Sequence, residues 1–117
     1  MKTLLITGGC GFIGSNFIHY LLAKYPDYRV VNLDKLTYAG NPANLASLAD
    51  DIRYRFVEGD ICDRAAVDAL VAEADMIVNF AAESHVDRSI IGGAEFVHTN
   101  FNGTYELLES AKEHGVE

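Results

Sequence analysis

Hydrophobic and polar positions follow two different patterns along this chain. Short apolar runs predict four strands, over residues 2–7, 29–34, 54–58 and 76–80. Between them, apolar residues recur every three or four positions, which predicts helices over 14–24, 42–48, 63–73 and 93–113. The strands read as continuous apolar runs, which is typical of strands buried on both faces.

The order of these elements predicts the fold class. Strands and helices alternate from residue 1 to residue 117 without an internal repeat, so we expect one α/β domain. Right-handed crossovers then give a doubly wound, Rossmann-like parallel sheet with strand order 3-2-1-4. In such a sheet a ligand crevice opens above the carboxyl ends of the first and fourth strands.

Several residues predict the ends and the buried sides of the helices. Asn41, Asp63 and Gly115 are expected to cap helices, the first with Pro42 at the first helical position. The first helix is expected to bury Phe17, Ile18, Leu21, Leu22 and Tyr25. The last helix is expected to bury Val97, Phe101, Thr104, Leu108 and Ala111.

A glycine-rich turn between the first strand and the first helix carries the main functional signal. Gly8, Gly11 and Gly14 lie three residues apart, and from Gly9 the spacing is G-x-G-x-x-G. Glycines here let a pyrophosphate approach the backbone at the amino end of a helix. Asp34 ends the second strand 20 residues after Gly14, where dinucleotide-binding folds place an acid. The alternative is a tight turn that binds no ligand.

Three strand ends supply further candidate residues. An acid at Asp34 accepts hydrogen bonds from ribose hydroxyls and repels a 2′-phosphate, so NAD is favoured over NADP, although Lys35 weakens that preference. Asp60 is either an adenine contact, with Ile61 packing on the ring, or a cap of a turn or helix. The small residues after Phe80 either admit a cofactor or pack against the glycine turn. Thr99 and Asn100 either face the cofactor or bond to backbone.

The loop after the fourth strand contains Ser84, His85, Asp87 and Arg88. Three near neighbours in one loop seldom reach the geometry of a hydrolytic triad, so we reject that interpretation. Contact with a substrate is the better prediction for Ser84, His85 and Arg88. For Arg88 the alternative is an ion pair with Asp87.

Composition narrows the set of partners. The net charge of −8 without a basic cluster argues against binding to nucleic acid or to anionic membranes. Neither a membrane-spanning run nor a secretory leader is present, so we expect a cytoplasmic protein. Cys10 and Cys62 have no metal-ligand spacing and predict neither a metal site nor a disulfide.

Four segments together resemble a known family. These are Thr7–Gly14 (TGGCGFIG), Leu33–Asn41 (LDKLTYAGN), Gly59–Asp63 (GDICD) and Ala81–Ile90 (AAESHVDRSI). They are similar to the extended short-chain dehydrogenase/reductases, and most of all to the dTDP-glucose 4,6-dehydratases. The second and fourth segments are specific to that group and its near relatives, whereas the glycine turn alone is not. The resemblance runs through the last predicted helix.

The resemblance implies a role for individual positions. Phe12 and Ile13 match residues whose backbone meets the pyrophosphate of NAD, and Asp34, Lys35, Leu36 and Thr37 match the segment at the adenosine ribose. Asp60 and Ile61 match the adenine site. Phe80, Ala81, Ala82, Glu83 and Ser84 match the segment that lines the cofactor, Ser84 also reaches the sugar nucleotide, and Thr99 matches a further cofactor contact.

The resemblance also implies a reaction and an incomplete enzyme. Family members use NAD to oxidise a sugar at C4, eliminate water across C5–C6 and return the hydride to C6. In those family members the Tyr-x-x-x-Lys pair, the Thr-Asp-Glu set and the substrate domain lie downstream of the part that this chain matches. We therefore expect residues 1–117 to be a dinucleotide-binding domain without catalytic residues and without turnover alone. The open edge of the fourth strand favours association, a homo-oligomer included.

Three alternatives remain on the sequence alone. One is the corresponding part of a nucleotide-sugar epimerase, and another is a stand-alone nucleotide-binding module. The third is a structural or interaction protein that binds no NAD.

Overall fold

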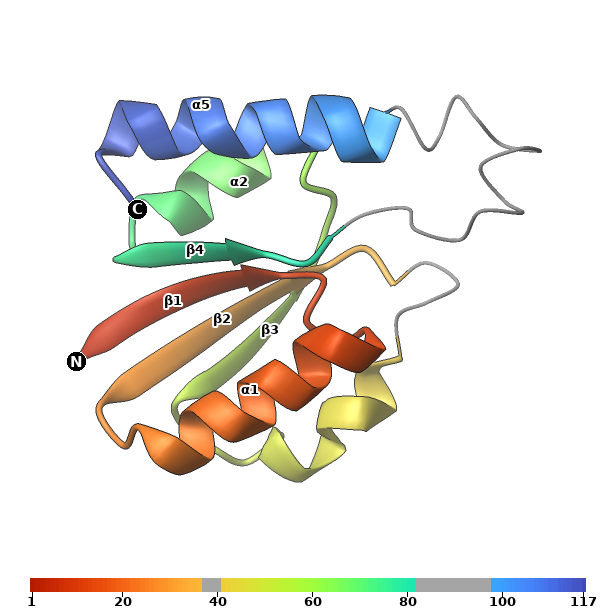
Figure 1. The fold of residues 1–117 in the computed structure, drawn as a ribbon, viewed down its shortest axis with the longest axis vertical. Helices are drawn as coiled ribbons and strands as arrows, with labels where there is room; N and C mark the ends of the chain where they lie inside the picture. The colour runs from red at the N-terminus through yellow and green to blue at the C-terminus, as the bar shows by residue number, and fades with distance from the viewer. Residues whose placement is uncertain (37–40, 82–97) are drawn as a thin grey trace.

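A computed structural model describes residues 1–36, 41–81 and 98–117 of the chain. Four strands form one sheet, namely β1 (Lys2–Thr7), β2 (Tyr28–Asp34), β3 (Tyr54–Glu58) and β4 (Met76–Asn79). All neighbours are parallel, and their order is β3-β2-β1-β4 (Figure 1). The predicted α/β class and the strand order 3-2-1-4 are therefore confirmed.

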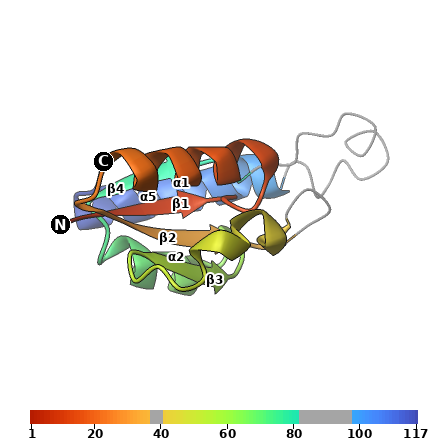
Figure 2. The same cartoon turned by 90° about the horizontal axis from the view of Figure 1, so that it is seen from below.

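Helices cover both faces of the sheet. The helix α1 (Phe12–Lys24) and the 3-10 helix η1 (Pro42–Leu48) lie on one face, and α2 (Arg64–Val71) and α5 (Thr104–His114) lie on the other (Figures 1 and 2). A π-helical turn, η2 (His98–Gly103), leads directly into α5. The arrangement is doubly wound, as predicted.

Each face of the sheet has its own apolar layer. Between the sheet and α1, the buried residues include Leu4, Ile6, Ile18 and Val30. Between the sheet and α2 and α5, they include Leu5, Val31, Val67 and Leu107. Successive residues of β1 and β2 alternate between these layers, which explains why the strands read as continuous apolar runs.

The capping predictions are confirmed. The Asn41 side chain accepts a hydrogen bond from the Ala43 amide at 3.0 Å, and that of Asp63 accepts one from the Ala66 amide at 3.4 Å. Gly115 ends α5 in the left-handed conformation, with φ of 66°. None of the helices in the described part of the chain has the length and hydrophobicity that a membrane crossing requires.

The prediction for the buried side of the last helix is wrong. Phe101 is 76% exposed and Leu108 is 65% exposed, whereas Leu107 and Ser110 are buried. The face of α5 that packs against α2 carries Leu107 and Ser110, and it lies one position before the predicted stripe. Val97 lies outside the described residues.

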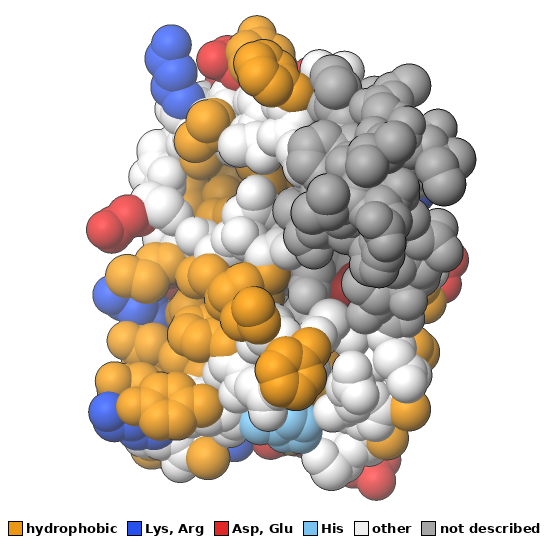
Figure 3. Space-filling model, turned by 45° about the vertical axis from the view of Figure 1, so that its right-hand side comes forward, with side chains coloured by type: hydrophobic (Ala, Val, Ile, Leu, Met, Phe, Trp, Pro, Cys, Tyr) orange, Lys and Arg blue, Asp and Glu red, His pale blue; other side chains and the backbone are white. Residues whose placement is uncertain are grey.

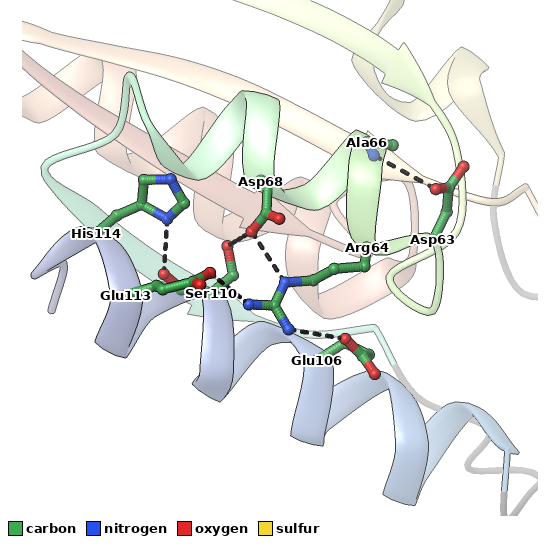
Figure 4. Close-up of polar contacts among 8 residues, drawn as sticks. All are labelled: Asp63, Arg64, Ala66, Asp68, Glu106, Ser110, Glu113 and His114. Carbon is green, nitrogen blue, oxygen red and sulfur yellow. Dashed lines mark hydrogen bonds and ion pairs between the residues drawn. The ribbon is translucent and has the colours of Figure 1, made fainter.

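An ion network joins α2 to α5 (Figure 4). The Arg64 guanidinium contacts Asp68 at 2.9 Å, Glu106 at 3.1 Å and Glu113 at 2.7 Å, and the Ser110 hydroxyl donates to Asp68 (Figure 4). These acceptors, Asp68 first, raise the pKa of Arg64 above its ordinary value. Asp68, Glu113 and His114 lie close enough to hold a metal ion, but Arg64 already pairs with both carboxylates, so the contacts indicate a structural network.

Candidate dinucleotide-binding site

The glycine turn is closely packed, since a Cβ on Gly8, Gly9 or Gly14 would lie less than 3.0 Å from another atom. Gly8 has a φ of 69°, and a Cβ there would lie 2.6 Å from the Ala81 nitrogen. A Cβ on Gly14 would lie 2.5 Å from the Gly8 carbonyl oxygen. Gly8 therefore allows the left-handed turn and the approach of the β4 end, and Gly14 lets α1 begin close to the turn.

The amides in the middle of this turn are held by side chains of β2. The Gly9 amide donates to Asn32 Oδ1 at 2.9 Å, and the Cys10 amide donates to Asp34 Oδ2 at 2.8 Å. The Gly11 amide donates back to the Gly8 carbonyl at 3.3 Å. Three consecutive N–H groups are thus satisfied within the protein, and they are not the donors that a ligand would meet first.

The next two amides, those of Phe12 and Ile13, belong to the first turn of α1. The first N–H groups of a helix have no partner within the helix, and they carry its positive dipole end. This end of α1 has no side-chain cap and no acidic residue in its first turn. The side chains of Phe12 and Ile13 are 82% and 68% exposed, so the helix begins at the surface. An anion placed here would complete the missing cap.

Asn32 is a residue of this site that the sequence interpretation missed. It is fully buried in the middle of β2, and its amide nitrogen donates to the Tyr54 hydroxyl at 3.1 Å and to Cys10 Sγ at 3.4 Å. A signal was available, since Asn32 lies two residues before Asp34 and so points to the same side of the strand. A buried amide within an apolar strand needs partners, and here the partners are the glycine turn and β3.

Asp34 is placed at the turn, as the glycine motif predicts. Its second carboxylate oxygen accepts the Leu36 amide at 2.7 Å, and the side chain is nearly buried. Leu36 has a φ of 59°, which is uncommon for a leucine, so the chain bends sharply directly after β2. Each carboxylate oxygen keeps a second lone pair that can accept a further hydrogen bond.

Asp60 is a turn cap, which is one of the two interpretations that the sequence left open, and its contact with adenine stays a prediction. Its Oδ1 accepts the Cys62 amide at 2.9 Å, as a turn cap does, while its Oδ2 lies 3.3 Å from Lys35 Nζ. Burial acts to raise the pKa of Asp60, but the Cys62 amide and Lys35 outweigh it, and the pKa lies below the ordinary value. Ile61 is buried against η2, so its contact with an adenine ring stays a prediction.

The end of β4 packs tightly against the turn. The Phe80 amide donates to the Thr7 carbonyl at 2.9 Å, and the Ala81 amide lies 3.3 Å from Thr7 Oγ1 and 3.1 Å from Asn79 Oδ1. The Phe80 ring lies 5.5 Å from that of Phe17. The small residue at Ala81 is therefore explained by its approach to Gly8, and its contact with a cofactor stays a prediction.

Several predicted site residues lie outside the described residues. They are Thr37, Ala82, Glu83, Ser84, His85, Asp87 and Arg88. Thr99 belongs to η2, but the structure does not describe its side chain.

Both cysteines lie beside acids near the ends of the strands. Burial, followed by the charge of Asp34, raises the pKa of Cys10 to about 11. Burial, followed by Asp60, raises the pKa of Cys62 to about 11. Both groups are therefore neutral thiols at pH 7, which agrees with their interpretation as unreactive side chains.

The candidate residues share one edge of the sheet. Each strand has one of them at or just past its carboxyl end, namely Thr7 for β1, Asp34 for β2, Asp60 for β3 and Phe80 for β4. The four strands all point to the right in Figure 1. Figure 3 brings that side of the molecule forward and shows hydrophobic side chains gathered mainly on the left of the view. The glycine turn and the acids are thus brought together where a doubly wound sheet binds its ligands.

Comparisons with known proteins agree with this geometry. The family model described as GDP-mannose 4,6 dehydratase matches residues 5–117. The low-salt glycan biosynthesis protein Agl12 of Haloferax volcanii is 63% identical over 108 residues, which cover 92% of this chain and 34% of that protein.

Two solved structures illustrate the likeness. The dTDP-glucose 4,6-dehydratase DesIV of Streptomyces venezuelae, with NAD bound, superposes with a TM-score of 0.93 at 54% identity, over 98% of this chain and 37% of that one. The UDP-Glc/GlcNAc 4-epimerase of Campylobacter jejuni superposes with a TM-score of 0.87 at 32% identity, over 99% of this chain and 35% of that one.

The chain thus spans about a third of the length of the relatives it matches. Within that third, the family match includes the glycine turn, Asp34, Asp60 and the end of β4. By this match over nearly its whole length, the chain belongs to the GDP-mannose 4,6 dehydratase family.

Proposed function

We propose that residues 1–117 form the NAD-binding domain of a nucleotide-sugar 4,6-dehydratase that acts on dTDP-glucose. The observation that carries this proposal is a difference between the amides of the glycine turn and those at the start of α1. Those of Gly9 and Cys10 are held by Asn32 and Asp34, whereas those of Phe12 and Ile13 lie at the surface end of α1.

The described residues fit a dinucleotide. The amides of Phe12 and Ile13 would hold the pyrophosphate, and Asp34 would accept the adenosine ribose hydroxyls with its remaining lone pairs. Asp60 and Ile61 would meet the adenine. NAD, when bound, supplies the hydride acceptor and donor, while the protein binds and orients it.

The substrate is proposed from the relatives and from the resemblance. DesIV, at 54% identity, is a dTDP-glucose 4,6-dehydratase. The whole protein would convert dTDP-glucose to its 4-keto-6-deoxy product in the cytoplasm, and Ser84, His85 and Arg88 would contact the sugar nucleotide. We expect the 117 residues alone to bind NAD without turnover.

A nucleotide-sugar 4-epimerase is the second candidate, because an epimerase superposes with a TM-score of 0.87. Its identity of 32% is lower than the 54% of the dehydratase, and the segments Leu33–Asn41 and Ala81–Ile90 favour the dehydratase.

The proposal is tested by calorimetric titration of the chain with NAD⁺ and NADP⁺. The informative variant is Phe12→Pro, which removes one amide hydrogen at the first position of α1. Proline is favoured there, and the preceding Gly11 is already extended, with ψ of 175°. Phe12→Ala is the matched control, because it removes the same side chain and keeps the amide.

A hydrogen bond to a charged group contributes about 1.5–3 kcal/mol. Phe12→Pro should therefore weaken NAD⁺ binding about 10- to 100-fold relative to Phe12→Ala, with equal melting temperatures. Equal affinities of the two variants would contradict the assigned pyrophosphate site. No binding of NAD⁺ to the folded, unsubstituted chain would contradict the proposed function itself.

A further inference from the structure

The ends of β2 and β3 bring a lysine and an aspartate together beside the expected ribose site. Asp34 pairs with Glu58 in the parallel register, and the Gly59 amide continues the ladder by donating to the Asp34 carbonyl at 3.0 Å. The next residues, Lys35 and Asp60, are thereby neighbours. Lys35 Nζ lies 3.3 Å from Asp60 Oδ2, with 45% and 28% of the two side chains exposed.

The side chains of Asp34 and Lys35, which are adjacent at the end of β2, reach different parts of the molecule. Asp34 reaches the turn that opens α1, where it accepts the Cys10 amide. Lys35 reaches the loop that opens α2, where Asp60 is fixed by the Cys62 amide. Successive side chains at a strand end point to opposite sides of the sheet, which separates the two groups.

This separation bears on the choice between the two nicotinamide cofactors. NADP carries a 2′-phosphate on the adenosine ribose, which is the sugar that Asp34 is proposed to bind. A carboxylate repels that phosphate, and a lysine ammonium next to it would offset the repulsion. The Asp60 carboxylate instead attracts the lysine ammonium and holds it on the adenine side.

We infer that Asp60 is a specificity-determining residue, which strengthens the preference for NAD over NADP by holding Lys35 away from the 2′-position. The inference rests on the proposed NAD-binding function. It gives Asp60 a second role, distinct from any contact with adenine, because the two cofactors carry the same adenine.

The test compares the ratio of the dissociation constants for NADP⁺ and NAD⁺ in four chains: the unsubstituted protein, Asp60→Asn, Lys35→Gln and the double variant. Asparagine keeps the acceptor for the Cys62 amide but removes the charge that holds Lys35. A lost adenine contact would weaken both cofactors equally and would cancel in the ratio. Glu58→Gln is the matched control, since it removes one nearby negative charge and leaves the Lys35–Asp60 pair in place.

Asp60→Asn should lower the ratio about fivefold at low salt, which is the size of one exposed charge pair. Addition of Lys35→Gln should restore the ratio, and Glu58→Gln should leave it unchanged. An unchanged ratio in Asp60→Asn, or a change that persists in the double variant, would overturn the inference while NAD⁺ binding stands. Failure of the unsubstituted chain to bind NAD⁺ would overturn the proposed function, and this inference with it.

Discussion

Replacement of Asn32 by leucine tests whether the glycine turn is held from β2. Leucine is similar in size and suits an apolar strand, so the substitution removes hydrogen bonds with little change of volume. It leaves the Gly9 amide without its acceptor and the Tyr54 hydroxyl without its donor. Asn32 is fully buried, so water cannot replace the first of these bonds.

The expected loss of stability follows from these two bonds. A buried donor left without a partner costs about 1–3 kcal/mol, and the half-buried Tyr54 hydroxyl adds less because it is nearer to solvent. We expect Asn32→Leu to lower the free energy of unfolding by about 2–4 kcal/mol. That loss is a large part of the 5–15 kcal/mol typical of a domain.

The assay is urea unfolding, combined with hydrogen exchange of the Gly9 amide. Asn32→Leu should shift the urea midpoint and speed exchange at Gly9 more than within β1. Asn16→Ala is the control, because the exposed Asn16 also bonds to backbone but should change stability by less than about 0.5 kcal/mol. A midpoint unchanged by Asn32→Leu, with Gly9 still protected, would refute the reasoning.

Three further predictions concern the turn, the acid at the end of β3 and the cysteines. Gly8→Ala should destabilise the fold by more than Gly115→Ala in thermal melts. Both glycines have positive φ, but a Cβ on Gly8 would lie 2.6 Å from backbone, whereas a Cβ on Gly115 would meet nothing within 4 Å. Equal losses of stability would contradict the close packing of the turn. The pKa of Asp60 is lower in the folded chain than its ordinary value of 3.8, so the ionised carboxylate stabilises the fold. This stabilisation is fully present above pH 3.8 and is lost as the pH falls from there through the pKa of the folded chain. Acid titration should therefore show a smaller loss of stability in Lys35→Gln, and a loss equal to that of the unsubstituted chain would disprove the coupling. Cys62, with its pKa raised to about 11, should react with iodoacetamide at pH 7 far more slowly in the folded chain than in urea, and equal rates would contradict its environment.

Most of the fold could be predicted from the sequence, because its signals are local. The strands β1 and β3 begin and end where their apolar runs do, and Asn41, Asp63 and Gly115 cap the helices that follow or precede them. The strand order followed from connection rules that hold for nearly all parallel sheets. In these places local propensity and tertiary packing favour the same structure.

The error in the last helix had a cause that a periodicity count does not detect. Residues Phe101, Leu107 and Leu108 supply apolar side chains on more than one side of the helix, so the sequence fits several helical faces. The packing of α5 against α2 selects the face that contains Leu107 and Ser110. That selection depends on contacts between elements far apart in the chain.

The candidate site was predictable at its glycines and at Asp34, but not in the way its parts depend on one another. The motif treats the turn and the acid as separate contacts with a ligand, whereas Asp34 also holds the Cys10 and Leu36 amides. Asn32 was not predicted as a site residue, because an amide side chain within an apolar strand looks only like an interruption of the apolar run. Its partner Tyr54 lies on another strand, which a motif does not include.

These shared residues link cofactor binding to the stability of the fold. Asp34→Ala would remove the proposed ribose contact together with the hydrogen bonds to the Cys10 and Leu36 amides, so loss of binding in that variant alone would not identify Asp34 as a ligand. Phe12→Pro separates the two effects, because the Phe12 amide belongs to the open first turn of α1. A ligand that binds the folded state alone stabilises it by about 2.7 kcal/mol at 100 times its dissociation constant. NAD⁺ should therefore protect the Gly9 and Cys10 amides against exchange, although neither is proposed to contact it, because ligand at the start of α1 restrains the turn that Asn32 and Asp34 hold from the other side.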